Sequence, residues 1–103
     1  FERENIKIYI GDQTNTDFLH SVLIDNDMPD IIIDDGGHTS NQQITSFNYL
    51  YEQLKYGGTY LVEDTHSSYE SEFQDRSDRL TFVEYAKHLS DELNHHKGKY
   101  NAF

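Results

Sequence analysis

The stretch that decides the fold is DIIIDDGGH, residues 30–38. A run of β-branched residues such as Ile31 to Ile33 is typical of a strand that is covered on both faces, and the acids and glycines after it predict a turn. A similar stretch, GGTYLVEDTH at residues 57–66, again places acids directly after an apolar strand. The repetition predicts an α/β fold with parallel strands.

Working outward, the chain predicts one more strand and three helices. Residues 6–10 alternate isoleucine with Lys7 and Tyr9, a period of two that predicts a first strand. Helical spacing then predicts apolar faces made by Phe18, Leu19, Val22 and Leu23, by Ile44, Phe47, Tyr51 and Leu54, and by Phe82, Ala86, Leu89 and Leu93. The expected order is β-α-β-α-β-α in one small domain, residues 1–103, with crossover helices between the strands.

Local signals refine the ends of these elements. Thr14 with Asp17, and Ser40 with Gln43, have the spacing of capping boxes that start helices. The polar residues 65–78 predict a long surface loop that can act as a lid. The cationic segment 95–98 is interpreted as the end of the last helix, because positive side chains suit the negative end of the helix dipole.

Composition excludes several classes of function. The 103 residues include 19 acidic and 8 basic side chains, for a net charge of −11, which repels nucleic acids and anionic membranes. The chain has no cysteine, so disulfides and thiolate metal sites are excluded and a reducing compartment, the cytoplasm, is expected. No apolar run approaches the roughly 20 residues that cross a bilayer.

The acids at the strand ends predict a metal site. Ligands of parallel sheets gather at the carboxyl ends of the strands, where Asp35, Glu63 and Asp64 would meet if the two strands pair. Such a concentration of negative charge is costly unless a cation or a shared proton neutralises it. Oxygen ligands favour Mg²⁺ over zinc, with Ca²⁺ or Mn²⁺ as alternatives. The other interpretation is that these acids cap helices, and Asp34 suits capping or backbone contacts in the turn.

Two histidines accompany the acids. His38 lies three residues after Asp35 on the same turn, so it can act as general base toward a hydroxyl at the metal, since an unperturbed imidazole titrates near pH 6.5. Gly36 and Gly37 allow either close backbone approach or a positive φ. His66 holds a similar position after the second acidic pair, and a surface or capping role is the alternative for both histidines.

Other candidates depend on the same loops. Asp12, after the first predicted strand, is a candidate for contact with the adenine or ribose of a cofactor, or else an ordinary turn residue. Tyr69 and the pair Ser67 and Ser68 are candidates for lining a substrate pocket, or for packing. The patterns GxGxxG, GxSxG, HExxH and the P-loop are absent from these residues, which argues against a complete nucleotide site, a serine hydrolase and a zincin.

Four stretches, YIGDQTNTDFL, DIIIDDGGHTSNQQITSFNYL, LKYGGTYLVEDTHSSY and FVEYAKHLSDELN, together resemble class I methyltransferases of the macrocin and mycinamicin type, which methylate sugars. The most specific part is DDGGH followed about 25 residues later by GGTYLVEDTH. The resemblance implies a partial Rossmann-like domain, S-adenosylmethionine and Mg²⁺ as cofactors, and a sugar or natural-product hydroxyl as substrate.

The resemblance also implies roles for single residues. Asp35 and Asp64, with Glu63 as the third, would be the metal ligands and His38 the base. Asp12, and Asp34 if it is not structural, would lie near the cofactor, while His66 and Tyr69 would lie near the substrate.

The family's glycine-rich cofactor loop precedes these motifs, so the resemblance covers the C-terminal half of such a domain. In the family's sheet the absent strands lie between residues 6–10 and 31–33. We therefore expect a gap in the sheet and weak cofactor binding. We also expect the first strand to be displaced, repacked or completed by another chain, and the last of these allows a homo-oligomer. A hydroxylase-like metal enzyme and a non-catalytic fragment with capping acids are the alternative functions.

Overall fold

The computed structural model describes residues 4–94. Two parallel strands, β1 (Ile31–Asp34) and β2 (Thr59–Val62), form the sheet, with Ile31 opposite Thr59 and Asp34 opposite Val62. The α-helices are α1 (Thr16–Ile24), α2 (Ser40–Leu50) and α3 (Phe82–Asn94). Short 3-10 helices follow as η1 (Tyr51–Gln53), η2 (Thr65–Tyr69) and η3 (Ser71–Phe73). The α/β class and the parallel pairing of the two strands are confirmed.

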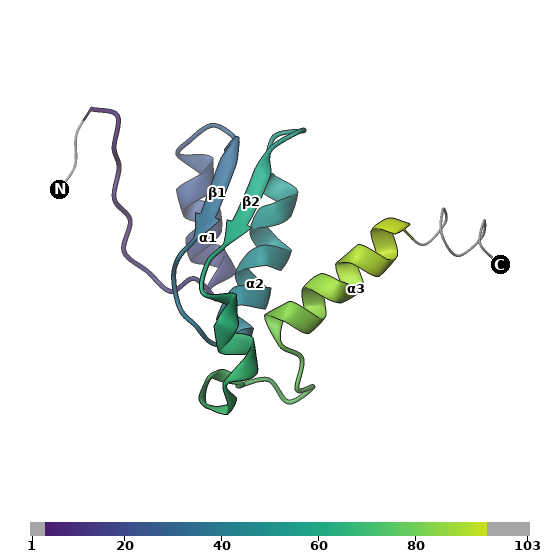
Figure 1. Cartoon of the computed structure of the whole chain (residues 1–103). Helices are drawn as coiled ribbons and strands as arrows, with labels where there is room; N and C mark the ends of the chain where they lie inside the picture. The colour runs from purple at the N-terminus through teal and green to yellow at the C-terminus, as the bar shows by residue number, and fades with distance from the viewer. Residues whose placement is uncertain (1–3, 95–103) are drawn as a thin grey trace.

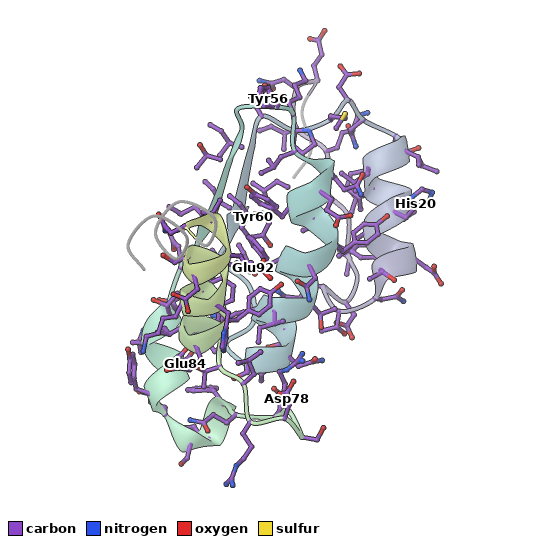
Figure 2. All side chains as sticks on the ribbon, turned by 90° about the vertical axis from the view of Figure 1, so that its right-hand side faces the viewer. His20, Tyr56, Tyr60, Asp78, Glu84 and Glu92 are labelled. Atoms are coloured by element: carbon purple, nitrogen blue, oxygen red, sulfur yellow. The ribbon has the colours of Figure 1, made fainter. Side chains whose placement is uncertain are left out.

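The core lies on the helical side of the sheet. Figure 2 shows the sheet nearly edge-on, with α2 beside it and α1 beyond α2. The Phe47 ring of α2 contacts the rings of Tyr60 and Phe82 at centroid distances of 4.9 and 6.1 Å. Leu19, Ile44 and Phe82 are the buried apolar side chains of the described chain. The α3 helix packs against α2 and η2 through its N-terminal end (Figure 1).

The prediction of a first strand at residues 6–10 is wrong. This segment runs apart from β1 and β2 (Figure 1), and the sheet contains two strands only among residues 4–94. A cavity of about 500 Å³ lies between the segment and the rest of the fold, with Tyr9 on one side and Val22 and Ile32 on the other. The pattern of isoleucines suits a strand, but the segment forms no strand of the sheet that β1 and β2 make. The segment is therefore displaced from the sheet, which is one of the outcomes expected from the sequence.

The prediction that both sheet faces are covered is also wrong for the described chain. Ile31 and Ile33 are 64% and 60% exposed, and Leu61 on the neighbouring strand is 45% exposed. Alternate residues of a strand point to opposite faces, so these three side chains share the face opposite Tyr60 and α2. One face of the sheet is thus apolar and open.

Both predicted capping boxes are one residue away from the observed caps. Asn15, not Thr14, caps α1 by accepting a hydrogen bond from the backbone N–H of Phe18 at 3.1 Å. Thr39 and Gln42, rather than Ser40 and Gln43, form the capping box of α2. Several residues of each segment have the right chemistry, and only the backbone course decides which of them lies at the helix end.

The polar segment 65–78 is not a simple surface loop. It contains η2 and η3, and Ser67 and Ser68 are buried. The last helix, α3, agrees with its apolar spacing. The predicted helix end at 95–98 lies outside the described residues. No helix in residues 4–94 has the length and apolar character needed to cross a membrane.

Candidate metal centre

Three carboxylates meet at the carboxyl ends of the two strands. Asp35 follows β1, and Glu63 and Asp64 follow β2. Because Asp34 lies opposite Val62 in the parallel register, the next residues of the two strands are neighbours. One oxygen from each of the three carboxylates lies within 4.8 Å of the others. The convergence that the sequence predicts is confirmed.

The cluster is strongly acidic and open to solvent. Asp35 and Glu63 are exposed, and Asp64 is half-buried. A hydrogen bond with Asp35, the negative charge of Asp35 and that of Asp64 raise the pKa of Glu63. Like charges that share a site disfavour full ionisation. The arrangement therefore attracts a proton or a cation.

The side chains of these acids make no capping hydrogen bond to a helix in residues 4–94, so the capping interpretation is wrong for them. The side chain that caps α2 belongs to Thr39. Asp64 precedes η2, but its side chain makes no capping hydrogen bond there. Asp35 and Asp64 therefore lack the structural role that was the main alternative to metal binding.

His38 lies directly beside the cluster. Its Nε2 atom is 3.3 Å from Oδ2 of Asp64, and its side chain is 42% exposed. The ring of Phe73 meets the His38 ring edge-on at a centroid distance of 5.5 Å, and the ring of His66 lies at 6.3 Å. Contacts from two directions thus orient the imidazole while one side of it stays open.

The backbone of Asp64 adopts an uncommon conformation. Its φ and ψ angles are 60° and 39°, in the left-handed region, which aspartate and asparagine tolerate better than most residues with a side chain. Non-glycine residues in this region are concentrated at functional sites. The turn of the chain at Asp64 brings its carboxylate toward His38.

Gly36 and Gly37 serve close approach rather than positive φ. Gly57 is the glycine with positive φ in the described chain. A Cβ atom on Gly36 would overlap the side-chain amide of Gln13, and one on Gly37 would overlap that of Gln42. Two glutamine side chains thus reach the turn because Gly36 and Gly37 have no side chains. The alternative of a positive φ at these two glycines is wrong.

Asp34 makes the turn contact that its position predicts. Its Oδ1 atom accepts a hydrogen bond from the N–H of Gly36 at 3.1 Å, and the residue is 9% exposed. Burial raises its pKa, against the lowering effect of the hydrogen bonds from Gly36 and Gln13. A contact of Asp34 with a cofactor stays a prediction.

The remaining candidates are spread around the site. Asp12 is exposed, and its Oδ1 accepts hydrogen bonds from the N–H and hydroxyl of Thr14 at 2.9 and 2.8 Å; these bonds lower its pKa. Tyr69 is 77% exposed. Ser68 accepts a hydrogen bond from the N–H of Val83 at 3.2 Å, so the pair Ser67 and Ser68 packs inside rather than lining an open pocket.

Phe73 and Gln13 were missed by sequence reasoning. Phe73 lies in the polar segment 65–78, where it and Tyr69 are the two large aromatic residues and this is the available signal. The segment is tied to α2, because the N–H of Asn41 donates to Asp75 at 2.8 Å and Arg76 donates to the Asn41 side chain at 3.2 Å. Gln13 follows the Gly-Asp pair that ends the first predicted strand, and nothing in its spacing indicates its contacts.

A cavity of about 320 Å³ adjoins the acidic cluster. Polar groups of Gln13, Asp34, Asp35 and Gly36 line one part of it, and Ile32 lines another. Together, the parallel strands, the acids at their carboxyl ends and this cavity define an α/β protein with a candidate ligand site in the position usual for such sheets.

Comparison with known proteins shows which enzymes this chain is similar to. The chain is 44% identical over 68 residues to 8-demethyl-8-alpha-L-rhamnosyl tetracenomycin-C 2'-O-methyltransferase of Streptomyces olivaceus, which covers 64% of this chain and 18% of the relative. It is 34% identical over 98 residues to demethylmacrocin O-methyltransferase of Streptomyces fradiae, covering 91% and 25%. It is 32% identical over 94 residues to mycinamicin VI 2''-O-methyltransferase of Micromonospora griseorubida, covering 87% and 24%.

The chain is thus similar to part of the sequence of O-methyltransferases of the macrocin and mycinamicin type. It spans about a fifth to a quarter of the length of these relatives. No family model and no solved structure matches it.

Proposed function

We propose that this chain carries the metal site and general base of an S-adenosylmethionine-dependent O-methyltransferase that acts on a hydroxyl of a sugar in a natural product. The observation that carries the proposal is the convergence of Asp35, Glu63 and Asp64 beside His38. The relatives are named as O-methyltransferases of a rhamnosyl tetracenomycin-C, of demethylmacrocin and of mycinamicin VI, which supports the reaction and the class of substrate.

The donor set fits a hard divalent cation. All three candidate ligands are carboxylates, and Mg²⁺ prefers one or a few carboxylates while keeping positions for water or substrate. Asp35, Glu63 and Asp64 would hold the ion. A divalent ion there supplies positive charge that lowers the pKa of a nearby substrate hydroxyl.

His38 is the proposed general base. In the tautomer with the proton on Nε2, that nitrogen donates to Asp64 and Nδ1 is free to accept a proton. S-adenosylmethionine would supply the methyl group to the substrate oxygen, and His38 would accept the proton that this oxygen loses. Phe73 and Asp64 keep the imidazole in place during this transfer.

The candidate residues of these 103 positions do not make up a complete cofactor site. Asp12 and Asp34 are the residues proposed to lie near the adenosine, and the cavity beside Gln13 and Asp35 has polar groups suited to a ligand. The 103 residues contain no glycine-rich loop of the GxGxxG type. We therefore propose that other parts of the domain complete the cofactor site, which agrees with the open apolar face of Ile31 and Ile33.

The test is metal binding followed by activity in the intact protein. Mn²⁺ titration monitored by electron paramagnetic resonance should show a site that Asp35→Asn weakens at least tenfold, because one charged ligand is lost. Asp91→Asn, at an exposed position on α3, is the matched control and should bind as the wild type does. Equal affinity in the wild type and Asp35→Asn would overturn the metal site. Metal binding without methyl transfer to any sugar hydroxyl would favour the hydroxylase-like alternative.

A further inference from the structure

The half-buried side chain of Gln13 connects three parts of the fold. Its Oε1 atom accepts a hydrogen bond from the N–H of Gly37 at 2.7 Å. Its Nε2 atom donates to Oγ of Ser46 on α2 at 2.9 Å and lies 3.4 Å from both carboxylate oxygens of Asp34. Ser46 returns a hydrogen bond to the backbone oxygen of Gln13 at 3.0 Å. One amide thus joins the 11–14 loop, helix α2 and the turn after β1.

The two contacts of Gln13 in the turn lie on either side of Asp35 in the chain. Asp34 precedes Asp35, and Gly37 precedes His38. Gly36 has no side chain, and any Cβ atom there would overlap the Gln13 amide. The side chain therefore fills the inside of the turn and limits the positions that residues 35 and 38 can adopt.

The chemistry of the contacts calls for a neutral amide. One end must accept from an N–H, and the other must donate to a hydroxyl and to a carboxylate. A glutamate would place a second negative charge near Asp34, and a leucine would leave the Gly37 N–H without its partner. Ser46 is 1% exposed, so its hydroxyl is a fixed anchor for the amide.

We propose that Gln13 is a positioning residue for the metal centre, which it serves by holding the 34–37 turn so that Asp35 and His38 face Glu63 and Asp64. The inference rests on the proposed metal site. Gln13 does not touch the cluster of ligands itself. It acts through the backbone of Gly37 and the side chain of Asp34.

The experiment measures Mn²⁺ affinity of the intact protein at a temperature where circular dichroism shows every variant fully folded. Gln13→Leu, close in size but without polar atoms, should lower the affinity about tenfold, the low end of the effect of groups that orient metal ligands. Ser46→Ala should lower it about threefold, the loss of one neutral hydrogen bond. The double variant should bind no more weakly than Gln13→Leu, because Ser46 acts through Gln13.

Gln53→Leu on η1 is the matched control, and it should bind Mn²⁺ as the wild type does. A role in stability alone would leave the affinity of folded Gln13→Leu unchanged, and that result overturns the proposal while Asp35→Asn still reports the metal site. Equal affinity in the wild type and Asp35→Asn overturns both. If Gln13→Leu does not fold, Ser46→Ala decides: wild-type affinity in that variant contradicts the proposal and a threefold loss supports it.

Discussion

His38 Nε2 lies 3.3 Å from Asp64 Oδ2, so the proposed base and a proposed metal ligand form one unit that bridges the ends of β1 and β2. His38 reaches the pair through the turn after β1, and Asp64 reaches it through a left-handed backbone conformation after β2. Phe73 then packs on the imidazole from the 3-10 segment. Three chain segments therefore determine where a proton acceptor lies relative to the carboxylates.

Replacing His38 should affect chemistry more than metal binding. In His38→Gln the rate of methyl transfer should fall by about 10²- to 10⁴-fold, the usual contribution of a general base, while Mn²⁺ affinity should fall by no more than about tenfold, because the three carboxylates remain and only a partner of Asp64 is changed. Single-turnover assays with the intact protein measure the rate. His88→Gln, at an exposed position on α3, should keep wild-type activity. A wild-type rate in His38→Gln would exclude the histidine as base.

Asp64 offers a separate test of backbone conformation and charge. Asp64→Asn and Asp64→Ala remove the same negative charge, but asparagine tolerates the left-handed region and alanine does not. We expect Asp64→Ala to have a free energy of unfolding about 1 kcal/mol lower than Asp64→Asn. Urea denaturation measures the difference. Equal stabilities would show that the left-handed conformation at residue 64 carries no such cost.

The sequence could predict the strands and the meeting of the acids because both depend on short-range patterns. Ile31 to Ile33 and Tyr60 to Val62 indicate strands by composition, and acids directly after parallel strands must lie at one edge of the sheet. The roles of Gln13 and Phe73 depend on contacts with distant residues, at separations of 24 and 35 positions to Gly37 and His38. No local sequence pattern indicates contacts between residues so far apart in the chain.

The failure at residues 6–10 has a different cause. The alternation of isoleucines describes a strand correctly only where a neighbouring strand can pair with it. Here the segment lies across a cavity from Ile32, and Ile10 is 94% exposed. A sequence pattern indicates that a segment prefers the strand conformation, whereas strand pairing also depends on which segment lies next to it in the fold. The shift of the capping boxes by one residue reflects the same limit, since Thr39 and Ser40 are chemically equivalent caps.

A side chain at position 37 should lower stability while Gln42 is present. A Cβ atom on Gly37 would overlap the Gln42 amide, which accepts a hydrogen bond from the Thr39 N–H at 3.1 Å as part of the capping box. Gly37→Ala should therefore lower the free energy of unfolding by about 1 kcal/mol, the usual cost of losing a cap. The loss should be smaller in a Gln42→Ala background, where the overlap is absent. Additive effects of the two substitutions would contradict this account.

The ion pair of Arg76 and Asp78 should make stability depend on acid pH. Arg76 donates to the Asp78 carboxylate at 2.7 and 3.0 Å, and the N–H of Leu80 donates at 3.0 Å. The hydrogen bond from Arg76 is the main cause that lowers the pKa of Asp78 from 3.8 to about 2. A carboxyl whose pKa is lower in the folded state stabilises the fold above its unfolded pKa, and this contribution is lost as the pH falls through the folded value.

Between about pH 4 and pH 2 the free energy of unfolding should thus fall more steeply in the wild type than in Asp78→Asn, which has no charge to lose at this position. Arg76→Gln should show the shallower dependence as well, because it removes the main cause of the lowered pKa. Urea denaturation at several pH values gives the slopes. Parallel curves for the wild type and Asp78→Asn over this range would mean that the ion pair does not persist in solution, as expected for many exposed pairs.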